Sequence, residues 1–359
     1  MQVLLRYIAV QHAKTLALVL AGLSVIHLTV RAVEKLRVLL GHEHPAIALI
    51  QFVALSLPGA VSVVTPFALL LSTILALGAL ASRSEIIAMR AAGFGIHRLA
   101  LPLLGIGLLA SLILLWASYA LVPKADALAG RILAEASDPR SGSPTFLHDR
   151  LWFRTEGNAV FGVASADMQA GVMSGVRILE LDGKGRVQRL TTARRMVFGK
   201  DGWFLEDGRI AGDDDGGLAV HGFSRRPAPL SRPPGELGNL SVRHEHVSVS
   251  DLSRYIRRLE DDGYDATPYR ASLASRMAMP FACLVMVLVA IPYGLILPRG
   301  KGIARGIATG LAIALCFWLL ISMSTALGRS GTLPAVPAAW LPLAIFSAWG
   351  AYRLMAVRQ

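Results

Sequence analysis

The feature that most limits how this chain can fold is the stretch Ala46–Ala81, which contains no charged side chain. An α-helix needs about 20 apolar residues to cross the hydrocarbon core of a membrane. Hydrophobic residues make up 54% of the chain and charged residues only 17%, too apolar a balance for one water-soluble core. The sequence therefore predicts an α-helical membrane protein with six transmembrane helices. The other apolar runs are Thr15–Val30, Leu99–Val122, Met277–Pro298, Gly306–Leu327 and Ser330–Tyr352.

The run Ala46–Ala81 is long for one spanning helix and short for two helices with a turn. Pro58 and Pro66 interrupt it. Prolines are tolerated in spanning helices, so we expect one long helix, with the helical hairpin as the alternative.

Basic residues near the ends of the apolar runs predict the orientation. With the N-terminus inside, ten of them face the cytoplasm and four face outward, as the positive-inside rule favours. The net charge of +12 then reflects topology and not nucleic-acid binding. The inner set is Arg6, Lys14, Arg83, Arg90, Arg98, Arg299, Lys301, Arg305, Arg353 and Arg358, and the outer set is Arg31, Lys35, Arg37 and Arg329.

The segment 124–276 differs from its surroundings and faces the periplasm in this orientation. It is polar and contains short β-compatible runs separated by turn signals such as Asp182-Gly183 and Asp201-Gly202. We predict an inserted periplasmic all-β domain, jellyroll-like or a sandwich, between helices one to three (1–123) and four to six (277–359). The runs are Leu151–Arg154, Ala159–Ala164, Val176–Leu181, Val187–Ala193, Trp203–Glu206 and Leu218–Val220.

The stretch at 251–262 has helical periodicity at the end of this domain. Its apolar residues share one helical face. We expect Ser250 to cap this trailing helix and Gly263 to end it. The shared face consists of Leu252, Tyr255, Ile256 and Leu259.

A short amphipathic helix is predicted near 84–93, between the second and third spans. Ser84 can cap it, Glu85 lies in its first turn, and Gly93 can stop it. Such a helix can dock into a groove on a cytoplasmic partner. The alternative is an ordinary interfacial loop whose arginines only set topology.

The stretch Pro58–Gly93, which contains LLLSTILALGALASRSEIIAMRAAG, resembles the signature region of the LptF/LptG family, the paired permeases of the lipopolysaccharide export ABC transporter. The resemblance continues through VPKAD at 122–126, through 251–294, and through the arrangement of three spans on either side of a periplasmic domain. It therefore covers nearly the whole chain. The β-rich segments around LWFR and GWFLEDGRI resemble the LptG branch more than the LptF branch.

The resemblance implies a non-catalytic inner-membrane permease that extracts lipopolysaccharide and passes it to a periplasmic bridge. The implied partners are a second, LptF-like permease, an LptB-like cytoplasmic ATPase dimer, a single-span LptC-like protein and an LptA-like bridge. ATP would be used by the ATPase, and this chain would carry no cofactor. A coupling-helix Glu of the family matches Glu85, and Ile86, Met89 and Arg90 share that helix.

Arg31, Lys35 and Arg37 stand at the outer end of the first span, where few cations are expected. In the family, basic residues there meet lipid A phosphates, and arginine can bind phosphate through two hydrogen bonds. The alternative is a snorkelling anchor at the interface. A further cation that LptG proteins can carry in the second span is absent, because Gly59 follows Pro58.

Other polar candidates are weaker. His27 lies in the first span, where a polar packing contact explains it. The triplets His42-Glu43-His44 and His244-Glu245-His246 resemble metal ligands only superficially, because a zinc site needs three or four convergent ligands. Cys283 and Cys316 lie in apolar runs and are expected to be packing residues. No metal or catalytic site is predicted.

Two functions of other classes remain open from the residues alone. One is an intramembrane lipid enzyme using Glu85 or His27, although no second catalytic partner has a usable spacing. The other is a scaffold that anchors envelope proteins through its β-domain. The motifs of phosphate-loop ATPases, serine hydrolases and HExxH metalloproteases do not occur in the sequence.

The predicted orientation can be tested by thiol labelling. Cysteine introduced near Gly183 should react with a membrane-impermeant reagent applied from outside the inner membrane, whereas cysteine near Gly300 should not. The reverse labelling would contradict the orientation.

Overall fold

The structure is a computed structural model of the chain. It describes residues 2–42, 44–136, 145–147, 150–154, 159–167, 171–182, 187–199, 202–214, 217–230, 249–261, 266–295 and 302–356. Gly183, Gly263, Gly300 and the triplet at 244–246 lie outside this part of the chain.

Two compact units make up the fold. The first contains Met1–Leu36, Leu49–Ala129 and Ala266–Gln359, and the second contains Arg37–Ala48 and Gly130–Asp265. The boundaries near 129 and 266 differ from the predicted 123 and 277. Helix α5 (Val122–Ala136) directly follows the third span, and helix α8 (Thr267–Ala278) begins before the fourth apolar run, so helical structure extends past the apolar residues.

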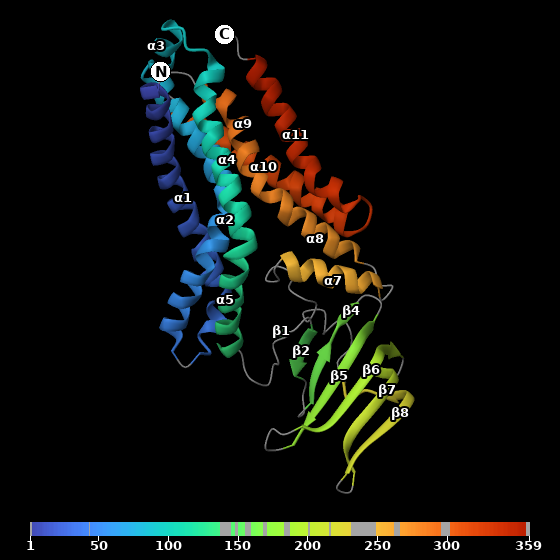
Figure 1. The fold of residues 1–359 in the computed structure, drawn as a ribbon. Helices are drawn as coiled ribbons and strands as arrows, with labels where there is room; N and C mark the ends of the chain where they lie inside the picture. Colours follow the sequence, from blue (N-terminus) through green and yellow to red (C-terminus); the bar gives the residue numbers. More distant parts are fainter. Residues whose placement is uncertain are drawn as a thin grey trace. The chain divides into compact units, whose positions relative to one another are not determined.

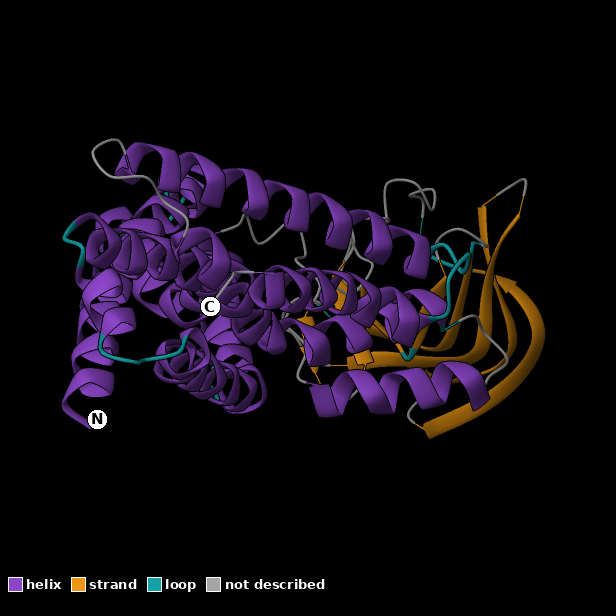
Figure 2. Ribbon diagram, turned by 90° about the horizontal axis from the view of Figure 1, so that it is seen from above, coloured by secondary structure: helices purple, strands orange, loops and turns teal. Residues whose placement is uncertain are grey.

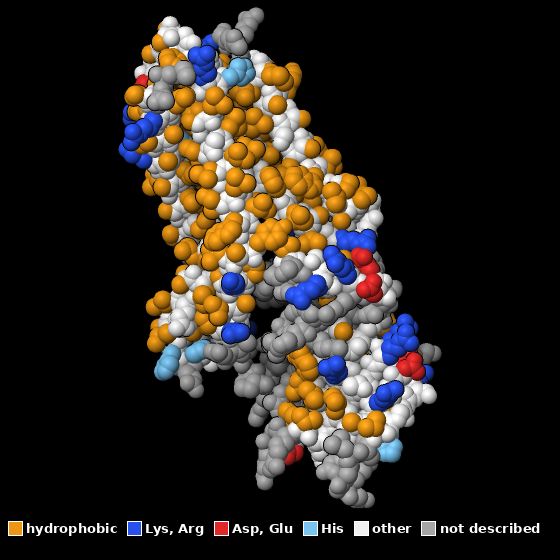
Figure 3. Space-filling model, in the orientation of Figure 1, with side chains coloured by type: hydrophobic (Ala, Val, Ile, Leu, Met, Phe, Trp, Pro, Cys, Tyr) orange, Lys and Arg blue, Asp and Glu red, His pale blue; other side chains and the backbone are white. Residues whose placement is uncertain are grey.

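Six helical segments among the described residues are long and apolar enough to span a membrane, which confirms the predicted number. Hydrophobic side chains cover much of the visible face of the helical unit (Figure 3). The segments are Val3–Leu39, Pro45–Ser82, Ile96–Ala120, Thr267–Leu295, Ala304–Arg329 and Ala335–Ala356.

Helices make up the whole of the first unit's regular structure among the described residues (Figure 1). They are α1 (Gln2–Leu39), α2 (Pro45–Ser82), α3 (Glu85–Ala91), α4 (Ile96–Ala120), α5, α8, the 3-10 turn η3 (Met279–Phe281), α9 (Ala282–Leu295), α10 (Gly302–Arg329) and α11 (Ala335–Ala356). Helix α2 is one helix with Pro58 and Pro66 inside it, so the single-helix interpretation is correct. Pro280 lies in η3, where its missing N–H removes a donor from an α-helical ladder.

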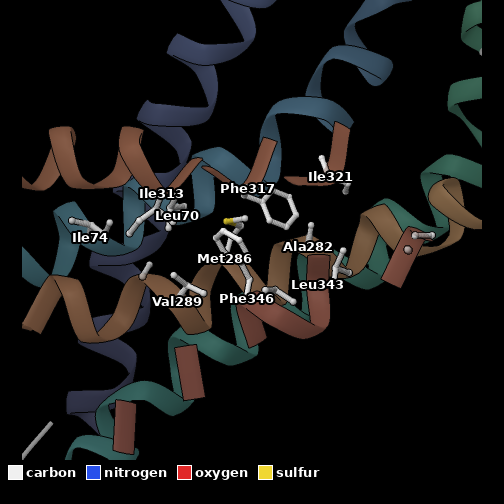
Figure 4. Close-up of a cluster of buried hydrophobic side chains, with 14 of the residues drawn as sticks. Leu70, Ile74, Ala282, Met286, Val289, Ile313, Phe317, Ile321, Leu343 and Phe346 are labelled. Carbon is white, nitrogen blue, oxygen red and sulfur yellow. The ribbon is translucent and has the colours of Figure 1, made fainter. Parts of the chain in front are cut away.

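Helix α9 is the most buried helix of the first unit. Seven of its residues are at most 1% exposed: Ala282, Cys283, Met286, Val287, Val289, Ala290 and Ile291. Figure 4 shows Met286 beside Phe317 of α10 and Phe346 of α11, whose ring centroids are 5.1 Å apart in an edge-to-face arrangement. Edge-to-face packing is a favoured geometry for aromatic pairs. The core of the unit is therefore built around α9.

Glycines bring three helices close to α9. A Cβ on Gly107 of α4 would lie 3.0 Å from Val287, and one on Gly350 of α11 would lie 3.1 Å from Val289. On α9 itself, a Cβ on Gly294 would lie 2.8 Å from Leu77 of α2. Small residues let membrane helices approach closely, where van der Waals packing drives their association.

The second unit contains an antiparallel sheet with the strand order β1-β2-β3-β5-β6-β7-β8, in which β4 pairs with β5. Figure 2 shows its long strands curving. The predicted inserted β-domain is thus confirmed, and its described strands form one antiparallel sheet. The strands are β1 (Thr145–Leu147), β2 (Arg150–Arg154), β3 (Ala159–Val163), β4 (Ser165–Asp167), β5 (Val172–Leu181), β6 (Val187–Gly199), β7 (Gly202–Asp214) and β8 (Gly217–Pro227).

The core of the sheet lies on one face. Phe161, Met173 and Met196 are fully buried there, together with Trp203 at 2% exposed. A Cβ on Gly162 would lie 2.7 Å from the ring of Trp152, so glycine is required where the ring crosses the strand.

Helix α7 (Val249–Asp261) also belongs to the second unit. Its predicted apolar face is confirmed, because Leu252, Tyr255, Ile256 and Leu259 are all buried. The predicted cap is wrong, since the helix begins at Val249 and Ser250 lies inside it.

Close packing at Gly107 can be tested with a control two residues away on the same helix. Gly107→Leu should lower the free energy of unfolding by about 1–3 kcal/mol, because the new side chain meets Val287. A Cβ on Gly105 meets no atom within 4 Å, so Gly105→Leu should change stability little. Thermal unfolding in detergent compares them, and equal midpoints would contradict the packing.

Candidate functional site

Helix α3 begins at Glu85, as the sequence predicts, but not through the predicted cap. Ser84 has the left-handed angles φ 62 and ψ 9, and its side chain makes no capping hydrogen bond. A serine cap requires an extended backbone, which places its oxygen over the first turn of the helix. Ser84 therefore occupies the predicted N-cap position, where its carbonyl accepts from the N–H of Ala88, but its side chain does not cap the helix.

The other end of α3 is fixed by Gly93, as predicted. Gly93 has φ 84 and donates its N–H to the carbonyl of Arg90, and Phe94 donates to the carbonyl of Met89. These two bonds form a Schellman motif, in which glycine takes the left-handed position without a Cβ penalty. The helix therefore ends where the sequence indicates.

The predicted coupling residues lie on different sides of α3. Ile86 and Met89 are 7% and 9% exposed and pack into the same hydrophobic cluster as Ile8 of α1. Arg90 is exposed, and the side chain of Glu85 is 27% exposed. Glu85 and Arg90 can therefore reach a partner, whereas Ile86 and Met89 attach α3 to its own chain.

The carboxylate of Glu85 already has two neighbours within its chain. Tyr7 of α1 donates its hydroxyl to Glu85 Oε2 over 3.0 Å. Arg83 Nη1 lies 3.9 Å from Glu85 Oε1. Oε1 therefore has the weaker of the two contacts, because 3.9 Å is longer than a hydrogen bond.

The outer cations on α1 also differ from one another. Arg31 and Lys35 are half-buried and one helical turn apart, and so lie on one face. Arg37 is exposed and belongs to the second compact unit. The site in the helical unit is therefore built on Arg31 and Lys35.

Arg31 lies beside a glycine of α2 and a carboxylate of α5. A Cβ on Gly59 would lie 3.6 Å from Arg31 Nη1 and 3.4 Å from Oδ1 of Asp126, which is 7% exposed. Position 59, where LptG proteins can carry a cation, is therefore a glycine with one basic and one acidic side chain close to it. Sequence reasoning gave Asp126 no role, although the residue ends the VPKAD segment.

An open apolar groove runs between α1 and α2. It has a volume of 360 Å³ and is lined by Val25, Leu28, Ala32 and Leu36 of α1 with Leu49 and Val53 of α2. Thr29 also lines it, but its hydroxyl donates to the carbonyl of Val25 within the same helix. The groove therefore offers a surface for hydrocarbon in the same stretch of α1 as Arg31 and Lys35.

The structure buries His12 in the first span, a histidine for which the sequence predicted no contact. His12 is 0% exposed, and its Nε2 lies 3.0 Å from Thr73 Oγ1 and 3.2 Å from Ser72 Oγ. The Ser72 hydroxyl also lies 3.2 Å from the carbonyl of Leu69, so it can bond both its own helix and the ring. Because both hydroxyls come from α2, the local sequence gave no signal for this contact.

The remaining polar candidates do not form a site. His27 is half-buried. Nδ1 of His42 accepts a hydrogen bond from the backbone N–H of His44, a contact within one turn. Over the described ranges, no three His, Cys, Asp or Glu side chains converge as metal ligands.

The fold and these residues define a multi-pass membrane protein with an inserted β-domain, a short helix between two spans, and cations beside an apolar groove. The family model for the lipopolysaccharide export system permeases LptF/LptG matches residues 6–356. The chain therefore belongs to the LptF/LptG family, and it is a multi-pass inner-membrane protein and a lipopolysaccharide export permease subunit.

Individual relatives agree with the family match. The lipopolysaccharide export system permease protein LptG of Escherichia coli (strain K12) is 24% identical over 352 residues, covering 96% of this chain and 95% of that protein. The protein of the same name from Haemophilus influenzae (strain ATCC 51907 / DSM 11121 / KW20 / Rd) is 23% identical over 321 residues, covering 89% and 87%. Neither comparison favours the lipid enzyme or the scaffold.

The contact between α1 and α2 can be tested by removing both hydroxyls that meet His12. Ser72→Ala combined with Thr73→Val leaves the buried Nε2 of His12 without these hydrogen-bond partners and should cost about 1–3 kcal/mol of stability. Thr65→Val is the matched control, because the Thr65 hydroxyl bonds the Val61 carbonyl of its own helix at 2.6 Å. Unfolding midpoints in detergent that fall equally for both variants would contradict a role for His12.

Proposed function

We propose that this chain is the LptG-type half of an ABC transporter that extracts lipopolysaccharide from the inner membrane and passes it to a periplasmic bridge. The single observation that carries the proposal is the pairing of Arg31 and Lys35 with an apolar groove in one stretch of α1. Lipopolysaccharide combines phosphates with acyl chains, so it needs cations and a hydrocarbon surface close together. The relatives named LptG support the choice of branch.

The partners in this proposal are those that membership of the family implies. A second permease of the same family would complete the cavity, and a cytoplasmic ATPase dimer would meet Glu85 and Arg90 of α3. Ile86 and Met89 would contribute by fixing the helix. A single-span protein and a periplasmic bridge would receive the lipid from the β-domain, which this orientation places in the periplasm.

The chemistry of the chain itself would be non-covalent. ATP would be hydrolysed by the partner ATPase, and this chain would use no cofactor. Arg31 and Lys35, with Arg37 farther along α1, would attract phosphate through charge-assisted hydrogen bonds. The groove would hold acyl chains through burial of apolar surface.

Photocrosslinking tests the proposal. A photoreactive amino acid replacing Leu36 in the groove should crosslink to lipopolysaccharide, and changing Arg31, Lys35 and Arg37 together to Gln should lower the yield about tenfold. A charge-assisted hydrogen bond contributes about 1.5–3 kcal/mol, and about 1.4 kcal/mol is tenfold in affinity.

The matched control is Arg329→Gln, which removes an exposed cation from the last turn of α10. It should leave the crosslinking yield unchanged. If the triple variant crosslinks as strongly as the control, the three cations are interface anchors and do not bind phosphate.

A further inference from the structure

Tyr7 joins two parts of the chain that are distant in sequence. Its hydroxyl lies 3.0 Å from Glu85 Oε2, and 78 positions separate the two residues. Hydrogen bonds to an ionised acceptor are stronger than those between neutral groups. The first turns of α1 are thereby tied to the carboxylate at the start of α3.

Apolar packing surrounds this contact. Ile8, next to Tyr7 in the chain, is 2% exposed and belongs to the cluster that also buries Ile86 and Met89 of α3. The body of α3 is therefore fixed against the bundle, with its C-terminal end closed at Gly93. Tyr7 adds to this packing a hydrogen bond that fixes the direction of the Glu85 carboxylate.

A second polar contact lies farther along the same helix. His12 meets Ser72 and Thr73 of α2, and all three side chains are fully buried. Beyond this point α1 has few buried positions, and Leu18 and Val25 are 76% and 63% exposed. Helix α1 is thus attached near its N-terminal end, while its other half carries Arg31 and Lys35.

We propose that Tyr7 is a positioning residue for coupling: it aims the Glu85 carboxylate at the ATPase and passes displacement of α3 to α1. The contact explains how a movement at the cytoplasmic end could reach cations near the other end of the same helix. This inference rests on the proposed function, in which Glu85 meets the ATPase.

The test uses Tyr7→Phe in the full complex of both permeases and the ATPase. The substitution removes one oxygen and keeps the ring, so insertion, abundance and ATPase copurification should not change. The lipopolysaccharide exported per ATP hydrolysed should fall about threefold to tenfold, the range expected for losing a hydrogen bond to a charged group at a partly exposed site. Tyr352→Phe, at an exposed tyrosine of α11, is the matched control and should leave the ratio unchanged.

A double-mutant cycle separates positioning from general stability. If Tyr7 acts through Glu85, Tyr7→Phe should have no further effect on the export ratio in a Glu85→Gln background. Independent decreases that add would overturn the inference. A proportional loss of export and hydrolysis, with an unchanged ratio, would also overturn it.

Charge reversal at Glu85 distinguishes the coupling role of Glu85 from the positioning role of Tyr7. Glu85→Lys with normal export would reject the coupling role of Glu85, and the inference about Tyr7 with it. If Glu85→Lys abolishes export while Tyr7→Phe keeps the wild-type ratio, the coupling role stands and the positioning role of Tyr7 is rejected.

Discussion

Close packing around α9 is the constraint on which the helical unit depends. A bundle in lipid gains little from the hydrophobic effect between helices, so its stability comes from van der Waals contact at short range. Gly107, Gly294 and Gly350 allow this short-range contact between α9 and the helices α4, α2 and α11. Helix α9 is buried among these three helices. The inner helices form a closely packed centre, whereas α1 and α10 keep large apolar side chains exposed.

Polar contacts in the span region then divide α1 into two parts with different surroundings. Near its N-terminus, Tyr7 and His12 connect it to α3 and α2. Toward its other end, Arg31 approaches Gly59 and the buried carboxylate of Asp126, beside an apolar groove. The guanidinium of Arg31 and the carboxyl group of Asp126 both lie beside Gly59, so an ionised Asp126 lowers the net positive charge at this position. A phosphate reaching Arg31 would meet this carboxylate as a competitor.

Features that depend on local pattern and length could be predicted from the sequence. All six spans, the unbroken α2, the end of α3 at Gly93 and the buried face of α7 depend on apolar spacing or on one glycine, and all are confirmed. The short strands β1 and β4 were not predicted, whereas the other strands were located. Strands β6 and β7 were predicted too short, because pairing with neighbouring strands extends them through polar residues such as Arg195 and Glu206. His12 and Asp126 could not be assigned, since their surroundings come from other helices. Ser84 occupies the predicted cap position without a capping side-chain bond, because residue type alone does not fix backbone angles.

In the proposed function this permease subunit depends on a partner ATPase, and that proposed dependence is the central claim about this chain. The most direct measurement is reconstitution of the chain with a second family permease and the ATPase in vesicles that contain lipopolysaccharide. We expect transfer of lipopolysaccharide to a soluble periplasmic acceptor that requires ATP hydrolysis and stops when this chain is omitted. Transfer at the same rate without the chain, or without ATP, would contradict the claim.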